Sequence, residues 1–148
     1  MKTLNKTASR IFGTLIQKMG TSDHLKLNNG GESIMPVIIE RLYKEIDFNG
    51  RPGDVYSLSH YYQQNGDLVP DPDMTFVVIT PDASTPETSV TERSRGVEVI
   101  PLTFQNSMYY TEAIFQSGGK WRISHTEQHD LAYFANMWLK NLKWQQNL

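Results

Sequence analysis

The period of the apolar residues changes twice along the chain, and this change limits the fold more than any other sequence feature. Close to each end, apolar residues recur every three or four positions, which is typical of an amphipathic helix. Between the ends, runs rich in Val, Ile, Tyr and Phe are separated by Gly, Asn and Pro, as strands and turns are. Helices on either side of a strand-rich middle predict an α+β protein.

The first predicted helix covers Thr3–Met19 and ends before Gly20, because glycine readily adopts the backbone conformation of a helix end. Lys6 and Arg10 lie on its polar face, and Lys2, just before its first residue, continues the same basic pattern. Basic residues on a helix can contact phosphate, but a solvated polar face has the same pattern and is more common. We therefore interpret the basic stripe as solvent-exposed and the apolar stripe as core.

The second predicted helix begins at Ser124, because Ser124–Glu127 matches the capping-box pattern. In addition to a core stripe, it carries apolar side chains at Tyr133, Met137 and Trp144. Coverage by the sheet and the first helix explains these residues most simply, since a sheet of this size needs a large lid. The alternative is an interface with a second copy of the chain or with another partner, and these three residues are its candidates.

The segments with strand character predict an antiparallel sheet of five or six strands with the N-terminal and C-terminal helices packed on one face. The continuous apolar run Val77–Ile79 predicts a central strand that is buried on both faces. Alternation within Asp54–Tyr62 places Tyr56, Leu58, His60 and Tyr62 on one face and Val55, Ser57, Ser59 and Tyr61 on the other. The central run belongs to the expected strand Met74–Thr80, and the other expected strands are Ile34–Ile46, Val97–Phe104, Met108–Phe115 and Lys120–Ser124. The short segment Leu25–Leu27 can pair as an edge strand.

Two connections between these strands are expected to be long. Asn65-Gly66 can form a tight turn, but Pro70 and Pro72 follow it, and proline lacks the N–H that a strand ladder needs. We therefore expect a proline-stiffened loop that lasts until about Met74. The segment Thr80–Gly96 has two prolines and no periodic apolar face, and we expect it to be a mobile loop.

Composition limits the class of protein. The 148 residues match the size of one domain, so we expect residues 1–148 to form a single α+β domain. The 14 Lys and Arg against 16 Asp and Glu give a net charge of −2, which disfavours strong nonspecific binding to DNA. The absence of cysteine excludes disulfides and thiolate metal sites, and it suits a reducing compartment. We expect a cytoplasmic protein with neither a membrane span nor a signal peptide.

Most of the polar chemistry is concentrated in Ser57–Phe76, where five residues form a candidate functional cluster. In one interpretation, its carboxylates bind a hard cation and its histidine is a further ligand or a general base. In the other, which we favour, aspartates beside prolines form turns and accept hydrogen bonds from backbone N–H groups. We predict no catalytic residue, no metal and no cofactor, because no reaction motif surrounds the cluster. Its members are His60, Tyr62, Asp67, Asp71 and Asp73.

Three segments carry a resemblance to a known family. They are Ser59–Phe76, with the sequence SHYYQQNGDLVPDPDMTF, then Val99–Gln105, and the ending Asp130–Gln145. Over its last two-thirds, the chain resembles an uncharacterised domain family found in proteins of plasmids, conjugative elements and phages. The family pattern has Glu where this chain has Gln63 and Asp73, and the loss of charge at Gln63 weakens any metal site carried over to the aspartates.

The resemblance implies a mobile-genetic-element setting and no established activity, and by association it implies an accessory or host-defence-related role. Our main hypothesis is a non-enzymatic binding module that engages a protein or a nucleic acid. The alternative is a metal-dependent enzyme centred on Asp67, Asp71 and Asp73 with His60. An acidic pocket around a buried, pKa-shifted His60 would favour the alternative.

Overall fold

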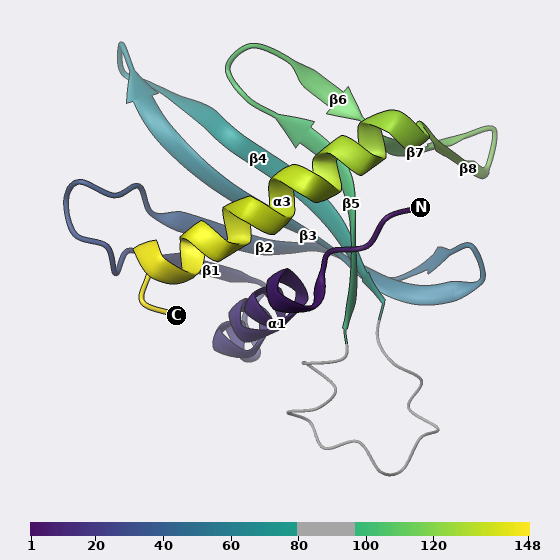
Figure 1. The fold of residues 1–148 in the computed structure, drawn as a ribbon, viewed down its shortest axis with the longest axis horizontal. Coiled ribbons are helices and arrows are strands. Elements are labelled where there is room, and N and C mark those ends of the chain that lie inside the picture. Colours follow the sequence, from purple (N-terminus) through teal and green to yellow (C-terminus); the bar gives the residue numbers. More distant parts are fainter. Residues whose placement is uncertain (80–96) are drawn as a thin grey trace.

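A computed structural model describes residues 1–79 and 97–148 (Figure 1). These residues form a six-stranded antiparallel sheet in the order β1-β2-β3-β4-β5-β6, a separate two-stranded sheet of β7 and β8, and two helices. The predicted α+β architecture is confirmed. The elements are α1 (Lys6–Met19), β1 (His24–Leu27), β2 (Val37–Phe48), β3 (Arg51–Gln64), β4 (Asp67–Ile79), β5 (Glu98–Gln105), β6 (Tyr110–Glu112), β7 (Ile114–Ser117), β8 (Lys120–Ile123) and α3 (His125–Gln145).

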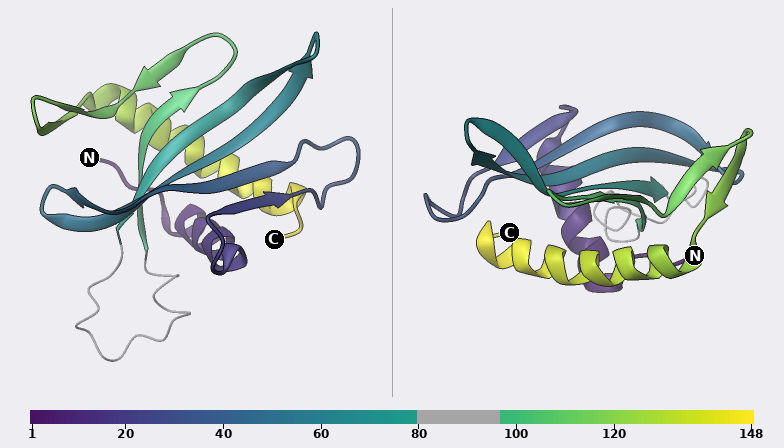
Figure 2. Two further views of the ribbon diagram at one scale, coloured as in Figure 1. Left: turned by 180° about the vertical axis from the view of Figure 1, so that it is seen from behind. Right: turned by 90° about the horizontal axis from the view of Figure 1, so that it is seen from above.

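Both helices lie on one side of the sheet, which curves over α3 (Figure 2). The main core fills the space between them. At its centre, the Phe12 ring of α1 makes edge contacts with Tyr56 of β3 and Phe76 of β4, with ring centroids 5.9 and 5.0 Å apart. From α3, Trp138 and Leu139 enter the same core. Burial of these large apolar side chains is what holds both helices against the sheet.

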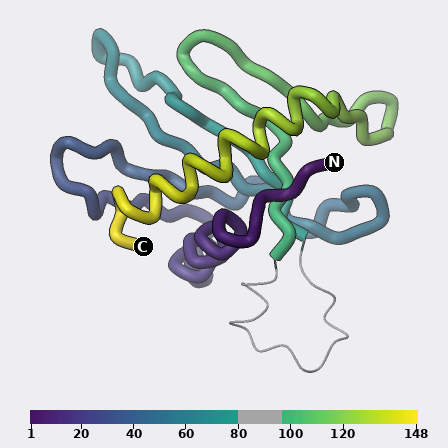
Figure 3. The backbone as a smooth tube through the Cα atoms, viewed as in Figure 1, coloured from purple at the N-terminus to yellow at the C-terminus, as the bar shows by residue number. Residues whose placement is uncertain are grey.

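The segment before α1 is also fixed against α3, and the path of the chain brings the two together (Figure 3). The Lys2 backbone exchanges two 2.7 Å hydrogen bonds with the side-chain amide of the buried Gln128. The Asn5 N–H donates to Asn136 Oδ1 at 2.9 Å. These bonds satisfy backbone groups of an irregular segment that packs on a helix.

The helix boundaries agree closely with the sequence prediction. α1 begins after Asn5, whose side chain accepts a hydrogen bond from the Ala8 N–H, and Gly20 follows its last residue with a φ of 59°. α3 begins after Ser124, as expected, but the Ser124 side chain makes no capping hydrogen bond. The capping-box pattern therefore predicts the correct first residue of the helix, but the hydrogen bond that it predicts for the Ser124 side chain does not form. Glu127 still lies in the first turn, where its charge is favourable to the helix dipole.

The connection between β3 and β4 differs from the prediction of a long loop. Asn65 and Gly66, with φ values of 52° and 86°, form a two-residue turn between the strands. β4 then begins at Asp67, which pairs with Gln64. Positive φ at both central residues matches the twist of a hairpin, so the turn chemistry of Asn-Gly outweighs the prolines that follow.

Two features of the sheet accommodate these prolines. The register shifts between Ser59 and Tyr61, so that β4 carries an extra residue opposite β3 around Pro70 and Pro72. In addition, β5 pairs with β4 only from Asp73 onward. Residues 67–72 of β4 therefore lie beside β3 on one edge and beside no described strand on the other. Proline is tolerated at a bulge and on an unpaired edge because no ladder hydrogen bond is lost there.

The segment expected as one strand, Met108–Phe115, is divided between two sheets. β6 adds to the main sheet beside β5, whereas β7 pairs with β8. The β7–β8 hairpin covers one end of the other sheet face, where the Trp121 ring lies 4.8 Å from the Phe48 ring. A second, smaller core forms there and includes Ile114. The prediction of a simple three-stranded meander is wrong. After β6 the chain leaves the main sheet, because Ile114 and Trp121 pack against apolar residues on the other face of that sheet.

Among the described residues, neither helix combines the length and the apolar composition that crossing a bilayer requires. The connection Thr80–Gly96, which the sequence predicts to be mobile, lies outside the described residues.

Candidate binding groove on the open face of the sheet

The sheet separates the members of the predicted functional cluster. His60 projects into the main core, where 4% of its surface is exposed and its ring centroid lies 5.6 Å from that of Trp138. Its Nδ1 atom is 3.0 Å from the Pro36 carbonyl oxygen, which can accept a hydrogen bond from it. Burial lowers the pKa of His60, while the Pro36 carbonyl and the Asp71 carboxylate oppose this shift. Tyr62 follows on the same face by strand alternation.

The three aspartates of the cluster do not converge. Asp67 is exposed beside the hairpin turn, Asp71 is exposed in the bulge, and Asp73 pairs with Ser59. Asp67 and Asp73 lie six residues apart in one strand, which corresponds to about 15–20 Å. Within residues 1–79 and 97–148, no group of three or more His, Asp or Glu side chains is placed to hold a metal ion.

Asp73 lies on the open face of the sheet, which is turned away from both helices. It lines a hollow of about 680 Å³ to which β1, β2, β3 and β4 contribute. A second hollow, of about 550 Å³, shares Leu42 and Thr75 with the first and continues toward the β7–β8 hairpin. We call the two hollows together the sheet-face groove.

The sheet-face groove has a mixed apolar and polar lining. The first hollow is lined by Lys26, Pro36, Ile38, Glu40, Leu42, Ser57, Ser59, Tyr61, Leu68, Asp73 and Thr75. The second is lined by Leu42, Tyr43, Ile46, Asp47, Val55, Thr75, Leu102, Thr103, Tyr110, Gln116 and Trp121. The predicted alternation of the Asp54–Tyr62 segment is confirmed, because Ser57, Ser59 and Tyr61 face this groove while Tyr56, Leu58 and His60 face the core.

A hydrogen-bonded pair forms part of the lining of the first hollow. The Tyr61 hydroxyl donates to Asp73 Oδ2 at 3.0 Å. Burial raises the pKa of the Asp73 carboxyl, the hydrogen bond from Tyr61 opposes this rise, and the nearby Glu40 carboxylate adds to it. Burial and the Asp73 charge together raise the pKa of Tyr61. A carboxylate is thus held half-buried, with a second carboxylate near it.

Further polar side chains lie on the same face of β4, β5 and β6. The hydroxyl oxygens of Thr75 and Thr103 are 2.5 Å apart. The Tyr110 hydroxyl donates to Glu112 Oε1 at 3.1 Å, and burial and the Glu112 carboxylate raise the pKa of Tyr110. Hydroxyl groups and carboxylates therefore line one path over the sheet.

This chemistry fits the recognition of a cation with an apolar stem. Glu40 and Asp73 supply negative charge, Ile38 and Leu42 supply apolar surface, and Lys26 is the one cationic side chain in the lining of the first hollow. An ammonium or guanidinium group that enters would relieve the repulsion between two carboxylates and form charge-assisted hydrogen bonds.

The second set of predicted residues lies on the other side of the molecule. Tyr133, Met137 and Trp144 are 65%, 50% and 78% exposed on the outer surface of α3. The simpler interpretation, that the sheet and the first helix cover them, is therefore wrong. They remain candidates for an interface.

Sequence reasoning found Asp73 but missed most of its surroundings. The alternation pattern predicts that Ser59 and Tyr61 share one strand face, yet nothing in the sequence distinguishes that face as the one without a covering helix, and Thr75 comes from the neighbouring strand β4. Glu40 comes from β2 and is brought close to β3 by strand pairing, with Ser57 opposite it. Its contribution follows from register, which the sequence does not define.

A domain family described as "Domain of unknown function (DUF6908)" matches residues 6–148 of the chain. Searches found no matching curated protein and no matching solved structure.

Proposed function

The chain belongs to the DUF6908 family of unknown function, and we propose from the geometry of the sheet-face groove that it is a non-enzymatic binding module for a basic segment of a partner protein. The observation that carries the proposal is the half-buried Asp73 carboxylate, held by Tyr61 beside Glu40 in an open, partly apolar groove. An Arg or Lys side chain complements this site because its alkyl stem matches Ile38 and Leu42 while its head matches the carboxylates.

The shape of the groove supports a protein segment over a free small molecule. Sites for small ligands usually enclose most of the ligand surface. Here two hollows follow one another over the open face of the sheet, from Leu68 on β4 to Trp121 on β8. Such a surface can hold several consecutive residues of an extended chain, with one basic side chain placed at Asp73.

The biological setting is part of this proposal. The resemblance of Ser59–Phe76 to proteins of plasmids, conjugative elements and phages supports an accessory role in a mobile genetic element. A module that binds a partner protein could serve such an element by engaging a host-defence component. We place the module in the cytoplasm, in keeping with a chain that contains no cysteine.

The metal-dependent enzyme remains the alternative function, and the geometry gives it less support. It requires Asp67, Asp71 and Asp73 to approach one another with His60, whereas Asp73 and His60 face opposite sides of the sheet. If the aspartates did hold a cation, manganese would raise the melting temperature of the protein, and Asp71→Asn would abolish that shift.

Selection from a random peptide library tests the proposal. Displayed nonapeptides selected on immobilised wild-type protein should be enriched in Arg or Lys at one position, next to apolar residues. Individual peptides from that pool should lose at least about tenfold in affinity toward Asp73→Asn, since a charge-assisted hydrogen bond contributes about 1.5–3 kcal/mol. Asp71→Asn is the matched control, because it removes an exposed carboxylate outside the groove, and it should bind like wild type.

Selected peptides without enrichment in basic residues would contradict the proposal. So would basic peptides that bind wild type and Asp73→Asn equally well. The melting temperature of each variant shows that lost binding does not reflect unfolding.

A further inference from the structure

The outer surface formed by α1, α3 and the segment before α1 has a charge opposite to that of the sheet. Residues 1–22 and 125–148 contain 6 Lys and Arg but only 2 Asp and Glu, whereas residues 23–124 contain 8 and 14. The net charge of −2 is therefore the sum of a basic helical layer and an acidic remainder. Long-range attraction of a partner depends on this local charge rather than on the total.

The cations of the helical layer are not neutralised by the described part of the protein. All six are exposed, and none forms a salt bridge with another described residue. By contrast, Arg41, Lys44 and Arg51 of the sheet each lie within 4.0 Å of a carboxylate oxygen. The six are Lys2, Lys6, Arg10, Lys18, Lys140 and Lys143.

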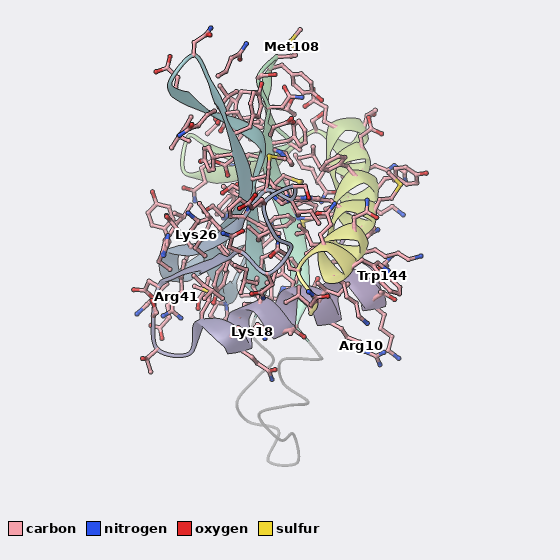
Figure 4. The ribbon with its side chains drawn as sticks, turned by 90° about the vertical axis from the view of Figure 1, so that its left-hand side faces the viewer. Arg10, Lys18, Lys26, Arg41, Met108 and Trp144 are labelled. Atoms are coloured by element: carbon pink, nitrogen blue, oxygen red, sulfur yellow. The ribbon has the colours of Figure 1, made fainter. Side chains whose placement is uncertain are left out.

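A stripe of large side chains runs along the outer surface of α3 among these cations. Tyr133, Met137, Lys140 and Trp144 recur every three or four residues, so they share one helix face. Tyr133 and Trp144 are separated by about 16 Å along the helix axis. Figure 4 shows Arg10 of α1 and Trp144 on the same side of the molecule. We call this surface the helix-face stripe.

The helix-face stripe joins a hollow beside the N-terminal segment. This hollow, of about 440 Å³, lies between residues 1–5 and α3, and its lining is more polar than apolar. Its lining includes Lys2, His129, Tyr133 and Asn136. Tyr133 therefore belongs to both the hollow and the stripe, which makes one continuous surface of aromatic, cationic and amide groups.

We propose that the helix-face stripe binds single-stranded nucleic acid. Cations that no described residue neutralises are available to backbone phosphates, and exposed aromatic rings can stack on unpaired bases. Met137 and Lys140 lie between Tyr133 and Trp144 on this face, so a cation is available to a backbone phosphate between the two rings. Insertion into a membrane fits less well, since an interfacial helix buries a broad apolar face. On α3 the buried face is already occupied by the protein core, and the stripe offers about one large side chain per turn.

The proposal is tested by fluorescence anisotropy with a fluorescein-labelled fifteen-nucleotide oligothymidylate. The wild-type protein should bind it, and the affinity should fall as salt concentration rises because counterions are released from the phosphates. Trp144→Ala and Tyr133→Ala should each weaken binding at least about fivefold, since each removes a stacking ring. Lys140→Glu should weaken binding further and reduce the salt dependence.

Lys120→Glu is the matched control for Lys140→Glu. It makes the same charge change at an exposed position on β8, outside the stripe, and should bind the oligonucleotide like wild type. The substituted aromatic residues are mostly exposed, so the variants should remain folded, and their melting temperatures verify this.

Three other results would overturn the proposal. The first is an absence of binding at low salt, and the second is binding that Tyr133→Ala and Trp144→Ala leave unchanged. The third is a different occupant of the stripe: phosphatidylserine vesicles or a polyglutamate peptide bound more tightly than the oligonucleotide, or a homodimer in light scattering that Trp144→Ala dissociates.

Discussion

Asp73 is the central charged residue of the proposed site in the sheet-face groove. Its side chain is half-buried and accepts one hydrogen bond from Tyr61, and Glu40 adds repulsion. The charged form of this carboxyl group is less stable in the free protein than it would be in water, and a bound cation would stabilise that charged form. Residues whose environment disfavours their charged form are often functional, because the groups that bind a ligand are not arranged for stability alone.

The first prediction is that Asp73→Asn stabilises the free protein at neutral pH. The folded-state pKa of Asp73 is raised above its usual value of 3.8, so its contribution to stability is present below that value and lost as pH rises through the folded-state pKa. Asparagine keeps an oxygen that can accept the Tyr61 hydrogen bond, but it carries no charge. Thermal unfolding at pH 7 should show a rise in melting temperature of about 4 °C for each kcal/mol gained.

The same experiment in acid is the internal control for this prediction. The advantage of Asp73→Asn should shrink as pH falls and Asp73 becomes protonated in the wild type. A melting temperature that is lower than wild type at pH 7 would contradict the description of Asp73 as an unfavourably placed charge.

His60 provides the second prediction, in which the sign is opposite to that of the usual partnered histidine. Its pKa is lowered in the folded state by burial, so neutral His60 contributes stability that is present above about pH 6.5 and lost as pH falls through the folded-state pKa. Urea unfolding should therefore show a free energy of unfolding that decreases from pH 7.5 to pH 5. His60→Gln removes the titrating group, and its curve should be flatter, although the variant is less stable overall. Equal slopes for the two proteins would contradict this role.

At the level of elements, α3 is held by one face and presents the other to solvent. Trp138 is 7% exposed and its ring contacts those of His60 and Phe134, whereas Trp144 is 78% exposed. The third prediction compares these two tryptophans on one helix. Trp138→Ala should lower the free energy of unfolding by about 3–5 kcal/mol, because it leaves a large cavity in the core. Trp144→Ala should change it by no more than about 0.5 kcal/mol.

Chemical denaturation of both variants checks this comparison. A small effect of Trp138→Ala would mean that α3 does not seal the core at this point. A large effect of Trp144→Ala would mean that its ring is covered, which would also remove it from the helix-face stripe.

The elements also show why sequence patterns predicted some parts of the fold and not others. The helices and the central strand were predictable, since Leu139 and Val77 belong to long periodic or continuous apolar runs. The sequence predicts a β4 that begins only at about Met74, because Pro70 and Pro72 argue against a strand. The bulge and the unpaired strand edge make the longer strand possible. Strand edges are a property of the assembled sheet, so local residues do not encode them directly.

At the scale of the whole molecule, the fold separates two surfaces of opposite charge. The net charge of −2 disfavours strong nonspecific binding to DNA, and the sequence pattern alone favours a solvated basic stripe at Lys6 and Arg10. The fold places that stripe beside α3 and leaves its cations without a described partner, while Asp73 and Glu40 lie on the opposite face. The distribution of charge along the sequence is the signal that could have revealed this separation, since no acidic residue precedes Asp23.

Together, our two proposals assign a basic protein segment to the sheet and a nucleic acid to the helices. The candidate site could be predicted only in part, because the five residues of the original cluster share a stretch of sequence but not a side of the sheet. Asp73 is the member that lies in the groove, and its partners Tyr61 and Glu40 come from two other strands.

The most direct test of the groove is an NMR titration of the isotopically labelled protein with N-acetyl-arginine amide, which isolates the side chain that the groove should recognise. We predict shifts of the amide resonances of Ser59, Tyr61, Asp73 and Thr75, with no comparable shifts on adding the neutral citrulline analogue or in Asp73→Asn. Shifts confined to α3, shifts of equal size with citrulline, or shifts that persist in Asp73→Asn would contradict the assignment of this groove as the binding site.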